Sequence, residues 1–203
     1  MAKEKKSIFL IQVEDFIKKT YSEQESNEII RSAWSRYEEI CVENSDEPTE
    51  MYVHTRERIY PAIATFDAQI AHGKSREEAT SLILEYYSWR SNIMGQKINK
   101  MMKFPLLYKA VPAICRVKMK VLFGETYGFK SNFYETPKSE VRFDMVACPY
   151  TNICKKYGCP EIVVAFCDAD DISFGSMHKK LIFTRTKTLA NGDECCDFCL
   201  KQI

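Results

Sequence analysis

Seven of the nine cysteines in this 203-residue chain lie in its last third, where acidic and basic side chains also gather. An ionised thiol is a nucleophile, a carboxylate accepts protons, and a guanidinium binds carboxylates through paired hydrogen bonds. The segment contains all three groups: the thiols of Cys148, Cys167 and Cys196, the carboxylate of Asp170 and the guanidinium of Arg185. We therefore place the candidate site in this part of the chain.

The residues before Arg185 predict that its side chain faces the protein interior. Side chains alternate between the two faces of a strand, so Leu181, Phe183 and Arg185 share one face of the strand expected over residues 180–187. A buried guanidinium needs a partner, which is either a structural carboxylate or the carboxylate of a ligand. Both alternatives stay open. On the strand expected next, Cys196 lies on the apolar face.

Two of the thiols occupy positions that would alter their reactivity. Cys148 directly precedes a predicted helix, where free backbone N–H groups and the helix dipole favour the thiolate; a capping or packing cysteine is the alternative reading. Cys167 and Asp170 are three residues apart, so on a helix they share a face and place a thiol beside a carboxylate. Asp168 and Asp171 could instead belong to a solvated acidic loop.

The sequence predicts neither a metal site nor an organic cofactor. Cys196 and Cys199 form a C-x-x-C pair, but on a strand they point to opposite faces, and a zinc site would show two such pairs. The three histidines lack the spacing of a zinc-binding helix. Phosphate-binding and dinucleotide-binding glycine motifs do not occur in the sequence.

An ordered series of motifs over residues 140 to 200 resembles the L-2-amino-thiazoline-4-carboxylic acid hydrolase family. The motifs are Cys148-Pro149-Tyr150, Gly158, Pro160-Glu161, Cys167-x-x-Asp170, Phe183-x-Arg185-Thr186-x-Thr188-Leu189-Ala190, Gly192 and Cys196-Asp197-Phe198. The resemblance implies a hydrolase that opens a five-membered cyclic amidine by breaking a C–N or C–S bond without a cofactor. Water adds to the carbon between sulfur and nitrogen, and ring opening gives N-carbamoyl-cysteine.

The same resemblance suggests roles for individual residues. Arg185 would bind the substrate carboxylate, and Thr188 would orient the substrate or shape the turn before Gly192. Asp170 would stabilise the protonated amidine or activate the water. A thiolate from one of the three cysteines (Cys148, Cys167 or Cys196) would attack the ring carbon, or these thiols would only line the pocket. A non-catalytic small-molecule binding or sensor domain with a cysteine-lined pocket is the alternative function.

The elements that must position these residues are mostly helical. Helices are expected over 8–16, from 23 onward, over 49–71 with a break at Pro61, over 76–103, over 106–123 and over 149–158. Residues 160–168 could form a helix or a buried strand, and we prefer the helix because of the proline at its start. In the first helix we expect Ile8, Ile11, Val13 and Phe16 on one face. Strands are expected over 141–147, 180–187 and 194–200. This is an α+β fold in which a helical N-terminal layer packs with a small antiparallel sheet near the C-terminus.

Length and composition favour a single domain over residues 1–203, with a mainly helical part (1–125) and a mixed part (130–203) that carries the cysteine motifs. The net charge is +1, and we take the well-mixed charges to argue against a nucleic-acid partner. The apolar run from Ile8 to Val13 is too short for a signal peptide, so we expect a cytoplasmic protein without a membrane partner. The expected partner is a small molecule with a carboxylate. The amphipathic N-terminal helices could also pack against a second copy, which leaves oligomer formation open.

Overall fold

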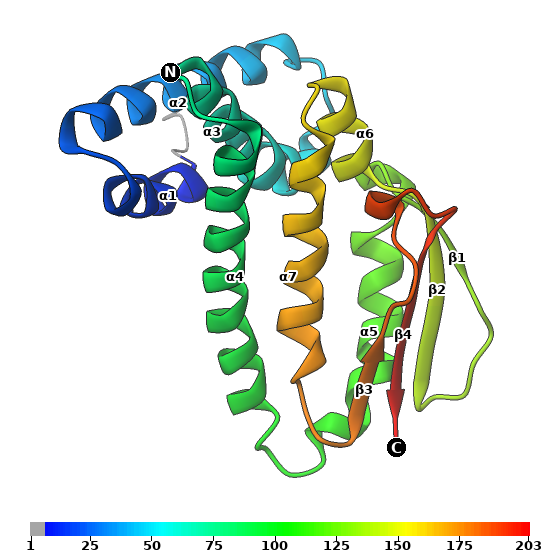
Figure 1. Cartoon of the computed structure of the whole chain (residues 1–203). Helices are drawn as coiled ribbons and strands as arrows, with labels where there is room; N and C mark the ends of the chain where they lie inside the picture. The colour runs from blue at the N-terminus through cyan, green and yellow to red at the C-terminus, as the bar shows by residue number, and fades with distance from the viewer. Residues whose placement is uncertain (1–6) are drawn as a thin grey trace. The chain divides into compact units, whose positions relative to one another are not determined.

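The computed structural model describes residues 7–203, and within them it confirms the predicted α+β class. Helices dominate, and a four-stranded antiparallel sheet forms from the C-terminal part of the chain (Figure 1). The chain divides into two compact units. Unit 1 is made of residues up to Tyr86 together with Ile153–Ile162, and unit 2 of Tyr87–Asn152 with Val163–Ile203. None of the helices formed by residues 7–203 is long and apolar enough to cross a bilayer.

Unit 1 is helical. It contains α1 (Ile8–Thr20), α2 (Glu23–Glu43), the 3-10 turn η1 (Thr49–Val53), the π-helical turn η2 (Thr55–Ile59), α3 (Tyr60–Ala71), the first part of α4 (Arg76–Met101), the end of α6 (Pro149–Lys156) and η4 (Pro160–Ile162). Side-chain caps define where the helices begin: Ser22 accepts a hydrogen bond from the Glu25 N–H, and Ser75 accepts one from the Glu78 N–H.

Two expectations for unit 1 were wrong in detail. Ile8 and Ile11 are exposed, because the buried face of α1 is centred on Phe9, Leu10 and Val13. The expected helix over 49–71 is instead a 3-10 turn, a π-helical turn and α3. Pro61 lies in the first turn of α3, where its missing N–H costs no hydrogen bond.

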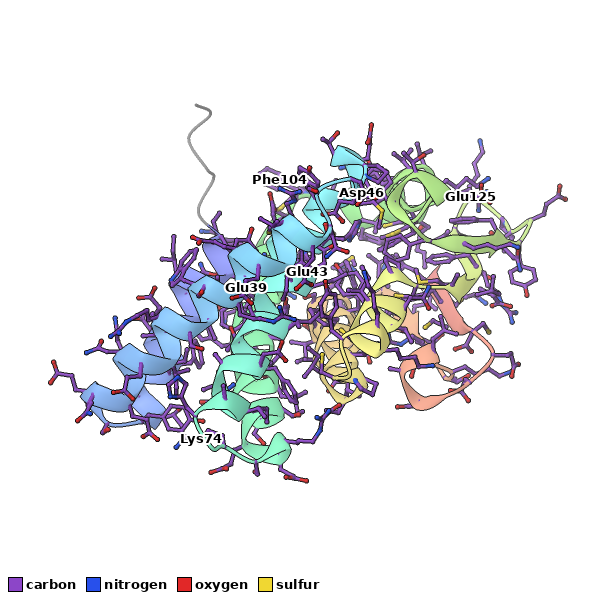
Figure 2. The ribbon with its side chains drawn as sticks, turned by 90° about the horizontal axis from the view of Figure 1, so that it is seen from above. Glu39, Glu43, Asp46, Lys74, Phe104 and Glu125 are labelled. Carbon is purple, nitrogen blue, oxygen red and sulfur yellow. The ribbon has the colours of Figure 1, made fainter. Side chains whose placement is uncertain are left out.

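Polar contacts connect α2 to the rest of unit 1. Arg36 on α2 forms an ion pair with Asp67 on α3 at 2.9 Å and another with Glu43 on α2. Figure 2 shows Glu43 and Glu39 along the same helix. The Tyr157 hydroxyl donates to Glu43 at 2.8 Å, so the segment after α6 is held against α2.

Unit 2 contains the sheet and the helices that cover it. Its elements are the remainder of α4, α5 (Leu107–Leu122), the 3-10 turn η3 (Glu125–Tyr127), β1 (Lys130–Phe133), β2 (Glu140–Ala147), the start of α6, α7 (Val163–Gly175), β3 (Leu181–Thr184), the 3-10 turn η5 (Leu189–Asn191) and β4 (Cys196–Gln202). The strand order is β1-β2-β4-β3, with every neighbouring pair antiparallel. The helical interpretation of residues 160–168 is confirmed, and β1 is a strand that we did not predict.

One face of the sheet is apolar and packs against helices. Phe143 on β2 lies opposite Phe198 on β4, and their rings stack with centroids 4.9 Å apart. Helix α5 contacts β2 and β4, and α7 contacts β3, so both helices lie on the same side of the sheet (Figure 1). On the other face, Arg142 is exposed and the Tyr134 hydroxyl donates to Asp144 at 2.6 Å.

Candidate functional site

All six residues singled out from the sequence as site residues lie in unit 2. Cys148 connects β2 to α6, and Cys167 and Asp170 are one turn apart on α7. Arg185 directly follows β3, and Cys196 is the first residue of β4. Thr188 lies in the connection between these two strands. The sheet and α7 therefore carry the candidate side chains on the apolar side of the sheet or at its edge.

Arg185 faces the interior, as the strand alternation predicted. Its side chain is 3% exposed, and Nη2 donates to the Cys167 carbonyl at 3.1 Å and to Asp171 Oδ2 at 2.6 Å. The guanidinium carbon lies 5.4 Å from the centroid of the Phe198 ring. The structural partner is thus Asp171, which belongs to α7 and not to a solvated loop.

The guanidinium of Arg185 keeps unused hydrogen-bonding capacity. A guanidinium has five N–H donors, and both hydrogen bonds that Arg185 makes to residues 7–203 use Nη2. Burial lowers the pKa of Arg185, but the negative charges of the neighbouring groups, Cys167 first and then Asp171 and Asp170, outweigh burial and raise the pKa above its usual value. Arg185 is therefore a permanently charged donor that can hold a second carboxylate.

The thiols of Cys148, Cys167 and Cys196 lie close enough to affect one another's ionisation. Burial raises the pKa of Cys148 to about 11 and that of Cys167 to about 12, and it also raises the pKa of Cys196. The N–H groups of Tyr150 and Thr151 do donate to Cys148 at the start of α6, and they lower its pKa. Their effect is smaller than that of burial, so of the two interpretations of Cys148 the packing cysteine agrees better with its surroundings.

Asp170 lies at the wall of an apolar cavity of about 40 Å³ enclosed by α5, α7 and the sheet. The lining includes Met119, Phe123, Val141, Phe143, Phe174, Phe183, Phe198 and Leu200, together with Cys115 and Cys199. The charge of Asp170 also raises the pKa values of Cys167, Cys196 and Arg185. This carboxylate therefore belongs to both the cavity and the group formed by the thiols and the guanidinium.

Sequence reasoning missed Cys115 and Asp171. Val111, Cys115 and Met119 are spaced four residues apart along α5, which puts them on one face of the helix. This spacing could have placed Cys115 on the side of α5 that faces the sheet. Burial raises the pKa of its thiol. No sequence signal distinguished Asp171 from the neighbouring aspartates, because only the packing of α7 on β3 decides which of them reaches Arg185.

Thr188 takes part in the turn between β3 and β4. Its hydroxyl accepts a hydrogen bond from the Asn191 N–H at 3.2 Å, and its own N–H donates to Asp193 at 2.7 Å. Gly192 follows with φ +91°, a conformation that glycine adopts without steric cost. Asp197 accepts hydrogen bonds from the N–H groups of Thr186 and Lys187. These contacts support the role of Thr188 in shaping the turn. The turn connects the segment that carries Arg185 to the strand that begins at Cys196.

Among residues 7–203, no group of three or more His, Cys, Asp or Glu side chains is arranged to hold a metal ion. A family model described as L-2-amino-thiazoline-4-carboxylic acid hydrolase matches residues 52–200 of the chain. The match covers all of the candidate site residues. A search of curated proteins found no match.

Proposed function

Because the chain belongs to the L-2-amino-thiazoline-4-carboxylic acid hydrolase family, we propose that it opens a cyclic amidine bearing a carboxylate to give an N-carbamoyl amino acid. The substrate class is that of 2-amino-thiazoline-4-carboxylate. One observation carries the proposal: a buried arginine with unused donors and the carboxylate of Asp170 belong to one group beside an apolar cavity.

The proposed reaction balances with water as the only co-substrate. The water oxygen bonds to the ring carbon between sulfur and nitrogen, and the bond from this carbon to sulfur breaks. Sulfur leaves as a thiol, and the ring nitrogen becomes an amide N–H. The product is N-carbamoyl-cysteine, in which the carboxylate is unchanged.

Arg185 and Asp170 supply what this reaction needs. The free N–H donors of Arg185 would form charge-assisted hydrogen bonds with the substrate carboxylate, which fixes the position of the ring. Asp170 would face the amidine, stabilise its protonated form and accept the proton of the attacking water. The apolar cavity walls would exclude bulk water and so strengthen both electrostatic interactions.

The raised thiol pKa values favour direct attack by water over attack by a cysteine. At neutral pH, Cys148 with a pKa of about 11 and Cys167 with a pKa of about 12 are protonated, and the thiolate is the nucleophilic form. In this proposal the three thiols are neutral and take no part in bond formation, and Cys167 and Cys196 are neighbours of Arg185 and Asp170. A covalent route through Cys167 is the second candidate, because this thiol lies beside both Arg185 and Asp170.

A non-catalytic binding domain would use the same cavity without needing an acid at its wall. The charge of Asp170 acts on Cys167, Cys196 and Arg185, so this carboxylate belongs to an ionisable group and is not only part of an apolar lining. We favour the enzyme because a carboxylate at the cavity wall can accept the proton of an attacking water.

The test is turnover of the thiazoline acid by the full chain, with N-carbamoyl-cysteine measured by mass spectrometry. We expect Asp170→Asn to lower kcat by roughly 10²- to 10⁴-fold, the usual contribution of general acid–base catalysis. Asp168→Asn, two residues away on α7, is the control for charge removal and should stay within about threefold of the unchanged protein.

The cysteine variants separate the two routes. Under direct hydration, Cys148→Ser, Cys167→Ser and Cys196→Ser each keep activity within about tenfold. In the covalent route the Cys167 thiolate bonds to the ring carbon, the ring C–S bond breaks, and water hydrolyses the resulting S-linked isothiourea. Abolished turnover in Cys167→Ser alone, with this adduct detected by mass spectrometry in the unchanged protein and absent from the variant, would establish that route instead. Unchanged turnover in Asp170→Asn would contradict the assigned role of this carboxylate.

A further inference from the structure

Unit 2 contains a long run of the chain that carries only positive charge. Residues 87–124 include eight Lys or Arg and no Asp or Glu, although the net charge of the whole chain is only +1. This run forms the end of α4, the turn that follows it, and all of α5. The near-neutral net charge of the chain therefore hides a strong separation of positive from negative residues. This separation weakens the argument from well-mixed charges against a polyanionic partner.

The turn between α4 and α5 lies at the lower end of both helices in Figure 1. It exposes large apolar side chains. Met101 is 56% exposed, Phe104 70% and Leu106 60%. Leu106 has φ 64°, so the backbone holds a non-glycine residue in the left-handed region at this point. Exposed lysines alternate with these side chains at Lys100 and Lys103.

The exposed apolar surface continues along α5. Ile114 is 44% exposed, Val117 67% and Val121 57%, and their spacing of three and four residues puts them on one face of the helix. The opposite face of α5, which includes Cys115 and Met119, packs toward the sheet. Lysines at 109, 118 and 120 are exposed beside the outer stripe. This outer face is therefore apolar at its centre and positive at its edges.

A second positively charged segment reaches the same turn. An open groove of about 390 Å³ beside Phe104 and Leu106 is also lined by Lys103, His178 and Lys179. Residues 172–192, which contribute His178 and Lys179, again contain no Asp or Glu. The Tyr108 and His178 rings stack at 4.4 Å and form a firm wall for this groove.

We propose that the α4–α5 turn and the outer face of α5 bind the surface of an anionic phospholipid bilayer. Phe104 and Leu106 would enter the boundary between headgroups and acyl chains, and the lysines would contact lipid phosphates. Charge complementarity is the main argument, because two separate segments at this surface lack acidic residues. Nucleic-acid sites stack bases on aromatic or arginine side chains. Apart from Phe104, the exposed apolar side chains of this surface are aliphatic or Met (Met101, Leu106, Ile114, Val117 and Val121), which favours lipid over nucleic acid.

The experiment is co-sedimentation of the full chain with vesicles of phosphatidylcholine alone or with 30% phosphatidylserine. We expect at least tenfold stronger binding to the anionic vesicles, weakened by added salt. Phe104→Ser with Leu106→Ser should reduce binding at least tenfold, and Val42→Ser, an equally exposed apolar residue of unit 1, should not. Lys100→Gln, Lys103→Gln and Lys109→Gln together should reduce binding about 100-fold, at about fivefold per lysine.

Circular dichroism spectra equal to that of the unchanged protein would show that each variant is folded. Equal binding to neutral and anionic vesicles, or no binding to either, would overturn the proposal. So would binding to duplex DNA or to polyglutamate that exceeds binding to the anionic vesicles, because the face would then recognise another polyanion. Thiazoline hydrolysis is measured separately, so a failure here leaves the proposed reaction unaffected.

Discussion

Replacing Arg185 by methionine tests the binding of the substrate carboxylate directly. Methionine keeps an unbranched apolar stem beside the Phe198 ring but removes the guanidinium, which lies 2.6 Å from Asp171 and 3.1 Å from the Cys167 carbonyl. Asp171 is half exposed, so water can solvate it in the variant. The Cys167 carbonyl loses its donor, and we expect a loss of stability of about 1–3 kcal/mol.

The effect on catalysis follows from the strength of hydrogen bonds to charged groups, about 1.5–3 kcal/mol each. If the unused donors of Arg185 hold the substrate carboxylate, Arg185→Met lowers kcat/KM for the thiazoline acid by about 10- to 150-fold, since 1.4 kcal/mol corresponds to tenfold. The analogue without the carboxylate, 2-amino-thiazoline, should already be turned over poorly by the unchanged protein. Its kcat/KM should fall less than threefold in the variant.

This combination of one protein variant and two substrates separates binding from structure. Arg142→Met is the matched control, because Arg142 is exposed on the opposite face of the same sheet. It should leave kcat/KM unchanged for both substrates. An equal loss for the acid and the analogue in Arg185→Met would refute the carboxylate contact and leave Arg185 with a purely structural role.

Three further measurements check the electrostatics and the turn. At pH 7.5, iodoacetamide should modify Cys148 ~300-fold and Cys167 ~3,000-fold more slowly than free cysteine. The reason is that thiols with pKa values of about 11 and about 12 contain little thiolate at this pH. Modification at the rate of free cysteine would contradict these pKa values. In urea unfolding, the free energy of unfolding should fall as the pH rises from about 8.5 toward 11, because the Cys148 thiol loses its proton in the unfolded chain before it does so in the folded protein. Cys148→Ser should remove about 3 kcal/mol of this fall. The same pH dependence in the variant and the unchanged protein would contradict the raised pKa of Cys148. Gly192→Ala should lower the free energy of unfolding by about 1–2 kcal/mol, because φ is +91° there, whereas Gly175→Ala in α7 should be neutral or stabilising.

Local signals in the sequence located most of the elements. Ser22 and Ser75 begin helices because each side chain satisfies a free backbone N–H of the first turn, and Gly73 ends α3 with a positive φ. These effects act within four or five residues, so they can be read without the fold. β1 was missed because its four residues show no hydrophobic alternation, and its pairing with β2 is a long-range contact.

The site was only partly predictable for the same reason. The inward direction of Arg185 followed from the period of two along its strand. Its pairing with Asp171 did not, since the packing of α7 on β3 selects one of three neighbouring aspartates. The state of Cys148 stayed open between two interpretations, because the helix start is a local signal whereas burial of the thiol depends on the whole of unit 2.

The sequence by itself determined the residue types of the candidate site, the family resemblance, the fold class and the acid-free run from 87 to 124, all of which depend on residue identity and near neighbours. Only the tertiary structure decided that the guanidinium is buried yet keeps free donors, that burial raises the pKa values of the thiols, and that Phe104 and Leu106 are exposed beside the lysines. Burial and pairing are set by contacts between distant segments, and these contacts determine both the charge of a group and its accessibility.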